Sequence, residues 1–274
     1  MLAYLKQVAA SWIDFPLRPG LIVRKKYRIE HFLGIGSYGL TYVGKELATG
    51  KEFVLKQAKP SKGSKARLLL AREADILQML DLAQIPKLTE VFEWRKKPFL
   101  VMDYIRGQTV EDLIFLEGRT FSETDCLKLM LELTRLVEMI HNQGIVHLDL
   151  RIPNVLMKEG KLHVIDFGLA RKIGEEPEPE PKGLDAAAAA EHRLRRTPQP
   201  ASDLYALGHF LLFLLYSAYE TPQEEEEADW QTELQLAPDL KGALRRLLQI
   251  DQPYSGATEF RSELIELLRV RSAL

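Results

Sequence analysis

The sequence predicts an α+β protein in which a small antiparallel β lobe of five strands and one main helix precedes a larger, mainly helical lobe. Three observations support this prediction. Between residues 27 and 104, short strand-like segments are separated by glycines. Within that region, residues 64–80 instead carry apolar side chains at helical spacing. After Gly107 the pattern becomes mainly helical.

An extension precedes the small lobe. Residues 1–26 mix apolar with basic side chains, and Pro16 and Pro19-Gly20 argue against one continuous helix there. We expect this extension to pack on the small lobe, with docking of a partner as the alternative. The five strands are predicted over residues 27–35, 40–45, 51–56, 88–94 and 99–104, with Thr49-Gly50 as the turn between the second and third.

The large lobe contains most of the helices. A long helix is predicted over residues 122–141, because Ser122 and Asp125 suit a helix start. Two short strands are expected around residues 155–157 and 163–165, and further helices over residues 111–116, 201–219, 237–250 and 258–270. The predicted organisation is therefore an extension (1–26), a first lobe (27–104) and a second lobe (105–274).

Composition excludes several classes of function. A net charge of −2 over 274 residues gives no general attraction to nucleic acid. The most apolar run, residues 204–219, is shorter than the roughly 18–20 residues of a membrane span, so no span is expected. The single cysteine, Cys126, cannot form an internal disulfide, and no secretory signal is recognised, which favours a cytoplasmic protein. The oligomeric state stays open.

Two segments have a biased composition. Residues 175–181 alternate glutamate with proline and cannot form a regular helix, because each proline removes a backbone donor. Residues Glu224–Glu227 form an acidic run. We expect both to be solvated loops, with docking of basic partners as the alternative.

The strongest chemical signal is the segment from His147 to Asn154, followed by Asp166-Phe167-Gly168. Phosphoryl transfer from ATP needs a carboxylate that orients the attacking hydroxyl, and oxygen ligands that hold magnesium against the phosphates. Asp149 and Asn154 lie at the two ends of a short loop, and Asp166 supplies a further oxygen from a neighbouring strand end. These motifs resemble the catalytic loop and the metal-binding loop of a protein kinase.

A glycine-rich segment agrees with this resemblance. Its G-x-G-x-x-G pattern also occurs in dinucleotide-binding folds, but there the loop leads into a helix, whereas here a strand continues through residues 40–43. A plain hairpin turn is the alternative. The resemblance implies that this hairpin covers the phosphates of ATP, with Thr41 in the place of the usual valine. The implied ATP-binding residues are Leu33, Gly34, Ile35, Gly36, Ser37, Tyr38, Gly39 and Thr41.

The same resemblance assigns roles further along the chain. Lys56, on the third strand, would contact the α- and β-phosphates and be held by Glu73, with Asp75 as the main competitor for that pairing. Residues 101–105 resemble the hinge between kinase lobes. Met102 would stand behind the adenine, although core packing explains it equally well, and the backbone from Asp103 to Ile105 would bind the purine edge.

In the catalytic loop, the resemblance implies that Asp149 orients the substrate hydroxyl and that Asn154 and Asp166 hold Mg²⁺, with Mn²⁺ as an alternative. Arg151 stands where serine/threonine kinases usually carry a lysine that touches the γ-phosphate. Leu148 replaces the arginine that in many kinases binds a phosphate on the activation loop.

The segment after the metal loop departs from the family pattern. It contains no serine, threonine or tyrosine between Gly168 and Glu191, which predicts independence from activation-loop phosphorylation. The A-P-E box is reduced to Ala189-Ala190-Glu191, its arginine partner would fall near Ser255, and Leu184 lies near the place of a supporting threonine. High helical propensity over residues 186–190 predicts an extra helix turn.

Across residues 27–270 the chain resembles a compact bacterial, eukaryotic-like (Hanks-type) serine/threonine protein kinase with the bilobal protein-kinase-like fold. The expected function is ATP- and magnesium-dependent phosphoryl transfer to serine or threonine hydroxyls of unidentified protein substrates. The alternatives are a small-molecule kinase of related fold and a nucleotide-binding pseudokinase scaffold. Pseudokinases usually lose one of three residues that this chain keeps, namely Lys56, Asp149 and Asp166.

Overall fold

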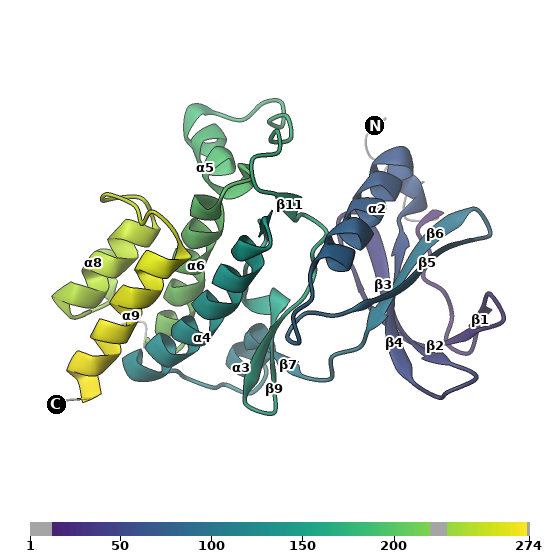
Figure 1. Cartoon of the computed structure of the whole chain (residues 1–274), viewed down its shortest axis with the longest axis horizontal. Helices are drawn as coiled ribbons and strands as arrows, with labels where there is room; N and C mark the ends of the chain where they lie inside the picture. Colours follow the sequence, from purple (N-terminus) through teal and green to yellow (C-terminus); the bar gives the residue numbers. More distant parts are fainter. Residues whose placement is uncertain (1–12, 220–228, 273–274) are drawn as a thin grey trace, which may run out of the picture. The chain divides into compact units, whose positions relative to one another are not determined.

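The computed structural model describes residues 13–219 and 229–272 of the chain. The chain divides into two units, and the division falls between Arg106 and Gly107. This point is two residues beyond the boundary that the sequence suggested. Strands β1 to β6 belong to the first unit and helices α3 to α9 to the second (Figure 1). The acidic run Glu224–Glu227 and the first part of the extension lie outside the described residues.

The first unit contains a six-stranded antiparallel sheet in the order β1-β2-β3-β4-β6-β5. The prediction of five strands was wrong by one, because β1 (Ile22–Val23) has only two residues and shows no alternation of its own; it pairs with Arg28 and Tyr27 at the start of β2. The other strands are β2 (Tyr27–Ile35), β3 (Gly39–Glu46), β4 (Glu52–Ala58), β5 (Leu88–Trp94) and β6 (Lys97–Asp103).

One face of this sheet forms the main core of the unit. Tyr27 packs edge-on against Phe53, with ring centroids 5.9 Å apart, and stacks on Phe92. Residues of the extension complete this core, since Leu17 and Leu21 pack against it and the Leu17 amide donates to the Tyr42 hydroxyl at 3.2 Å. The described part of the extension therefore belongs to the small β unit.

The main helix of the first unit is α2 (Gly63–Met79), which contacts β4, β5 and β6. A short 3-10 turn, η1 (Pro60–Lys62), leads into it. Asp14, which is buried, fixes this turn by accepting hydrogen bonds from the amide and the hydroxyl of Ser61. The extension thus also anchors the turn that leads into α2.

The second unit is mainly helical, and α4 (Glu123–Asn142) and α6 (Pro200–Tyr216) run through its interior. Ser122 and Asp125 form a capping box at the start of α4, as the sequence predicted. The remaining helices are α3 (Val110–Phe115), α5 (Ala186–Arg196), α7 (Trp230–Glu233), α8 (Pro238–Leu247) and α9 (Ala257–Ser272).

Helix α6 explains the most apolar run of the sequence. Most of its side chains are buried within the second unit, and a Cβ atom on Gly208 would lie 2.9 Å from Leu248 and 3.0 Å from Leu247. Glycine is therefore needed there for close packing against α8. Among the described residues, no helix is long and apolar enough to cross a membrane.

Short strands carry the chemically important loops of the second unit. Strands β9 (Val155–Lys158) and β10 (Lys161–Val164) form a hairpin, and β7 (Gln108–Thr109) adds to β9. Strand β8 (Ile145–Val146) pairs with β11 (Arg171–Lys172). The turn η2 (Ile152–Asn154) precedes β9 directly. The catalytic-loop segment therefore begins directly after β8, and the metal-loop segment ends at Gly168, shortly before β11.

Residues 169–197 differ from the sequence expectation in two ways. Residues 175–181 contain no helix or strand, as expected, but their acidic side chains are partly paired. The predicted extra helix turn is instead the 11-residue helix α5, which Asp185 caps by accepting from the Ala188 amide at 2.8 Å. The alanine run and this cap explain the longer helix, because both favour helix formation.

Candidate active site

The glycine-rich loop joins β2 to β3 in the first unit. The Gly36 amide donates to the Gly39 carbonyl at 2.9 Å, and the Tyr38 carbonyl accepts from the Lys59 amide at 2.8 Å. Leu33, Ile35, Gly36 and Ser37 are exposed. None of the three motif glycines has a positive φ angle, and a Cβ atom would meet no atom closer than 3.5 Å at any of them. The hairpin itself therefore does not require glycine at these positions.

Strand register brings three predicted ligand residues to one face of the sheet. Thr41 lies directly opposite Lys56 across β3 and β4, and directly opposite pairs share a face. Val54, two residues before Lys56, pairs with Met102 on β6, so the period of two places Met102 on the same face. The aromatic core occupies the other face. The sheet thus presents Thr41, Lys56 and Met102 together.

Lys56 forms an ion pair with Glu73 of α2, with 2.5 Å between Nζ and Oε1. The Lys56 side chain is 13% exposed and that of Glu73 is 4% exposed, so the pair is largely shielded from solvent. Asp75, the competing carboxylate, is exposed on α2. The apolar neighbours Ile76 and Leu77 are buried and fix the rotation of the helix that points Glu73 toward the sheet.

The hinge-like residues lie at the end of β6. Met102 is buried, and the Asp103 amide donates to the Lys87 carbonyl at 3.0 Å, while its carboxylate pairs with Lys51 at 2.9 Å. That backbone donor is therefore already used within the unit. Within residues 13–106, the Ile105 amide has no hydrogen-bond acceptor, which leaves it available to a ligand.

In the second unit, the catalytic-loop carboxylate is bonded to the predicted metal ligand. Asn154 Nδ2 donates to the Asp149 backbone carbonyl at 2.9 Å and to Asp149 Oδ2 at 3.0 Å. Both amide protons of Asn154 are thereby used, and its Oδ1 remains as an acceptor for a cation. The Ile165 amide donates to the Asn154 carbonyl at 2.9 Å, so Asp166 follows directly beside Asn154.

Two residues of these loops have strained backbones. Leu148 has a φ angle of 61° and Asp166 of 63°, a region that costs non-glycine residues about 1–3 kcal/mol each. His147, buried between the loops, accepts from the Asp149 amide at Nδ1 (3.2 Å) and lies 3.1 Å from the Ile165 carbonyl at Nε2. A carbonyl only accepts, so His147 is the neutral Nε2–H tautomer and links the two loops.

Asp203 of α6 anchors the backbone of the catalytic loop. Its carboxylate is fully buried and accepts from the amides of His147 and Leu148, both at 2.8 Å, and from His141 Nε2 at 2.9 Å. Burial is the largest single effect and opposes its ionisation. The hydrogen bonds from His141 and the His147 amide, together with the electrostatic effect of both histidines, outweigh burial and hold the pKa of Asp203 below its ordinary value. The charged carboxylate therefore fixes the strained Leu148 backbone.

Arg196, at the last position of α5, is among the residues of this site that sequence reasoning missed. Its Nη1 donates to the Leu148 carbonyl at 2.7 Å, and its Nη2 lies 4.0 Å from Asp149 Oδ1. Arg151 approaches the other carboxylate oxygen, with Nε 3.7 Å from Asp149 Oδ2. Two arginines therefore flank Asp149. The basic last turn of α5 was visible in the sequence, but nothing indicated which arginine reaches the loop.

The degraded A-P-E segment has no long-range arginine partner in the described part of the second unit. Glu191 pairs with Arg195 one turn later at 2.9 Å and is exposed. Ser255, where the usual partner would fall, instead bonds Glu259. Leu184 is exposed and cannot supply the hydroxyl of the missing threonine.

The described residues contain no group of three or more histidine, cysteine, aspartate or glutamate side chains that could hold a metal ion. The oxygen donors of Asn154 and Asp166 suit Mg²⁺, which usually takes one or two protein ligands together with phosphate oxygens and water. These two residues therefore fit a metal that is bound with a nucleotide rather than by the protein alone.

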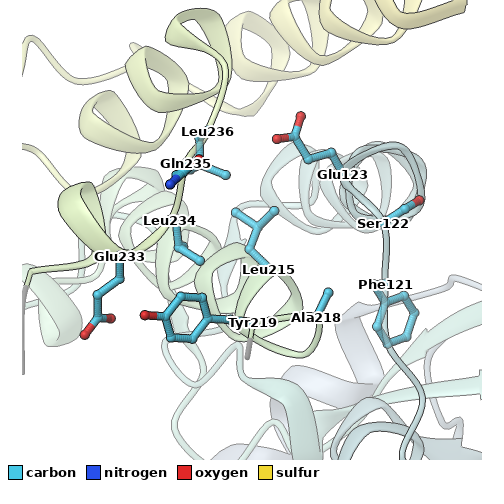
Figure 2. A pocket seen from close by; sticks show the side chains of 10 residues that line it. All are labelled: Phe121, Ser122, Glu123, Leu215, Ala218, Tyr219, Glu233, Leu234, Gln235 and Leu236. Atoms are coloured by element: carbon cyan, nitrogen blue, oxygen red, sulfur yellow. The ribbon is translucent and has the colours of Figure 1, made fainter. Parts of the chain in front are cut away.

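One surface pocket of the second unit, of about 340 Å³, contains none of the predicted site residues (Figure 2). It lies where the start of α4, the end of α6 and the segment after α7 meet. Its wall is mainly apolar, and Tyr219 and Leu234 lie near each other on one side of it (Figure 2). The pocket is thus separate from the catalytic and metal loops.

Comparison with known proteins identifies the family. A family model described as the protein kinase domain matches residues 27–270. The chain belongs to the protein kinase family. A probable serine/threonine-protein kinase of Bacillus subtilis (strain 168), YbdM, is 32% identical over 262 residues, which cover 95% of this kinase and 96% of that protein. Serine/threonine-protein kinase B of Synechocystis sp. is 26% identical, covering 82% of this kinase and 43% of that protein.

The fold of the kinase agrees with a solved structure. A crystal structure of the Mycobacterium tuberculosis PknI kinase domain, determined for a variant, superposes with a TM-score of 0.68 at 19% identity and covers 92% of this kinase and 99% of that chain. The predicted family, the α+β kinase fold and the class of serine/threonine protein kinase are therefore confirmed.

Proposed function

We propose that this kinase transfers the γ-phosphoryl group of ATP to serine or threonine hydroxyls of protein substrates, without phosphorylation of its activation segment. The observation that carries the proposal is the ordered catalytic loop. Asn154 holds the Asp149 carboxylate, whose side chain remains 21% exposed, and Asp203 fixes the loop backbone. A carboxylate that is oriented but reachable can position a substrate hydroxyl.

The first unit supplies the proposed contacts to ATP. Its motif glycines are not required by the hairpin, so their value lies in the close approach of a ligand to the loop backbone. Lys56 is held by Glu73 and can contact phosphate oxygens without losing its orientation. The Ile105 amide offers a hydrogen bond to a purine edge. Thr41 and Met102 share the face of Lys56 and suit the adenine.

The second unit supplies the proposed catalytic groups. Asp149 orients the attacking hydroxyl and accepts its proton as the bond to phosphorus forms. Arg151 adds positive charge near that carboxylate, where negative charge moves during transfer. Asn154 and Asp166 would hold Mg²⁺ (or Mn²⁺), which when bound neutralises charge on the phosphates.

Independence from activation-segment phosphorylation rests on two absences in the sequence. Residues 169–190 contain no phosphorylatable hydroxyl, and Leu148 cannot bind a phosphate as the usual arginine does. A mass spectrum that located a phosphate on residues 169–191 whose removal abolished activity would contradict this part of the proposal. The cytoplasmic location also remains a prediction, supported by the single cysteine.

A labelled-ATP assay tests the proposal. The purified kinase is incubated with Mg²⁺ and labelled ATP, alone and with myelin basic protein, beside Asp149→Ala and Asp166→Ala. We expect label on phosphoserine or phosphothreonine that is lost in both variants. Label only on small molecules would favour the small-molecule kinase, which the degraded Ala189-Ala190-Glu191 box permits. Nucleotide binding without turnover would favour the pseudokinase.

Lys56→Ala offers a second check, because it removes the proposed phosphate contact. We expect its activity to fall by about 100-fold or more, and that of Glu73→Ala by less, since Glu73 positions the lysine rather than the phosphate. Equal activity of Lys56→Ala and the wild type would overturn the assigned contact.

A further inference from the structure

Arg171, the first residue of β11, is a buried cation with a carboxylate partner from the acidic segment. Only 4% of its side chain is exposed. Its Nη1 donates to the backbone carbonyls of Leu169 (3.1 Å) and Ala170 (2.9 Å), and its Nη2 donates to Glu178 Oε1 at 2.6 Å. A guanidinium removed from water in this way needs both its charge and its hydrogen bonds satisfied.

The position of Arg171 connects three functional segments. It follows the metal loop by three residues, and it lies opposite Val146 of β8, immediately before His147 of the catalytic loop. Through Glu178, it also holds residues 175–181, which the sequence composition predicted to be a solvated loop. A change at this ion pair therefore acts on both loops of the second unit at once.

Further contacts hold the rest of the activation segment (residues 169–197) in place. The Gly174 amide donates to the Pro198 carbonyl at 3.0 Å, which brings the two ends of the segment together. Glu180 pairs with Arg193 of α5 at 2.8 Å, although both side chains are about half exposed. Arg196, one turn further along α5, then reaches the Leu148 carbonyl. The segment is thus tied to the catalytic loop at its beginning and at its end.

Prolines on both sides favour this arrangement. Pro177 and Pro179 flank Glu178 and restrict the backbone φ angle, so the unbound segment has fewer conformations to lose when it is ordered. Glutamate is ordinarily ionised at neutral pH, and its charge needs no modifying enzyme. The alternation of acid and proline therefore presents a permanent negative charge to Arg171 at a low cost in chain entropy.

We propose that Arg171 and Glu178 are positioning residues whose fixed ion pair orders the segment between the metal loop and α5, in place of a phosphate. The inference rests on the proposed function, because it assigns a cause to the proposed independence from phosphorylation. In kinases that use a phosphate, new charge on the loop pairs with arginine and orders the segment. Here the acceptor is a carboxylate encoded in the chain.

The experiment compares Glu178→Gln with Glu176→Gln in the full-length kinase. Both variants lose one charge from the same segment, but Glu176 is exposed and has no ion pair or hydrogen bond in the described part of the chain. Glu178 is 41% exposed, so its amide variant is expected to fold. Trypsin cleavage after Lys182 measures order in the segment, and it needs no catalytic activity.

We expect Glu178→Gln to be cleaved about tenfold faster than the wild type, and Glu176→Gln at the wild-type rate. We further expect kcat for a protein substrate to fall about tenfold in Glu178→Gln, with the KM for ATP unchanged.

Equal cleavage of the two glutamine variants would overturn the proposed role of the ion pair. Faster cleavage with an unchanged kcat would overturn the positioning role, because order in the segment would then not matter for transfer. A wild type without any phosphotransfer would instead overturn the proposed function, while the cleavage comparison would still decide whether Glu178 orders the segment.

Discussion

The catalytic loop (residues 147–154) and the activation segment (residues 169–197) are connected through Arg196, but different interactions hold them in place. The catalytic loop is fixed by buried hydrogen bonds to Asp203 and His147. The activation segment depends on ion pairs whose acidic partners Glu178 and Glu180 are each more than 40% exposed. Buried bonds are insensitive to salt, whereas exposed ion pairs are screened. The two regions should therefore be weakened by different kinds of substitution.

The largest effect is expected at the centre of the catalytic loop. Asp203→Ala removes the acceptor for the amides of His147 and Leu148 and leaves both buried without a partner. We expect a loss of about 3–5 kcal/mol in the free energy of unfolding, together with loss of activity. Urea denaturation measures the first quantity. Activity retained in a folded Asp203→Ala protein would contradict the anchoring role.

Ser202→Ala is the matched control for this change. Ser202 is also buried at the start of α6, but within the described residues its hydroxyl makes a single hydrogen bond, to the Thr197 carbonyl at 2.7 Å. Its loss should cost about 1 kcal/mol, with little change in kcat.

A smaller effect is expected where the two regions meet, at Arg196. Arg196→Met removes the donor to the Leu148 carbonyl and a cation 4.0 Å from the Asp149 carboxylate. We expect kcat to fall about tenfold, with an unchanged KM for ATP and little change in the unfolding midpoint.

Arg195→Met supplies the comparison for Arg196. Arg195 is also in the last turn of α5, but it pairs with Glu191 and, within the described residues, forms no hydrogen bond or ion pair with the catalytic loop. It should keep most of the wild-type kcat. Partial recovery of activity in Arg196→Lys, which retains the charge, would separate an electrostatic role from simple packing. Equal kcat values for Arg195→Met and Arg196→Met would contradict the proposed contact.

The contrast between the two regions also explains what the sequence could predict. The catalytic and metal loops were recognised because their chemistry needs particular residue types at fixed spacing, as at Asp149, Asn154 and Asp166. The predicted bounds of strands such as β2 and β5 agree with the structure, since these segments carry clear local patterns. Whether the site residues act as assigned remains a prediction that the kinetic variants test.

The activation segment could not be predicted in the same way. Arg171 and Glu178 are seven residues apart in an irregular segment, so no helical or strand period relates their side chains. The composition of residues 175–181 indicated only a solvated loop. Arg196 depends on where α5 ends relative to a loop 48 residues earlier, which is tertiary information. Likewise, strand β1 is too short to have a period.

A third prediction concerns His209, in the middle of α6, where acid should weaken the structure. Burial lowers the pKa of His209 to about 4 from an ordinary value of 6.5, and within the described residues its Nε2 has no hydrogen-bond partner. The folded state therefore binds this proton less well than the unfolded state, so stability is complete above pH 6.5 and declines as the pH falls toward 4.

His209→Gln removes this titration. We expect the decline in unfolding free energy between pH 6.5 and 4 to be smaller in this variant by about 1–2 kcal/mol, a value reduced for partial exposure. The measurement is urea denaturation at several pH values. Parallel pH profiles for the variant and the wild type would show that His209 is not the group responsible.

The smallest effect is expected at the exposed end of the activation segment. Glu180→Gln breaks the pair with Arg193, in which the side chains are 42% and 58% exposed. Exposed pairs contribute about 0–1 kcal/mol, so cleavage after Lys182 should rise no more than about threefold, and kcat should stay within twofold of the wild type. A Glu180→Gln effect as large as that of Glu178→Gln would mean that the segment is held by its total negative charge. The smaller effect would instead locate its control in Glu178, whose carboxylate lies 2.6 Å from the buried guanidinium of Arg171.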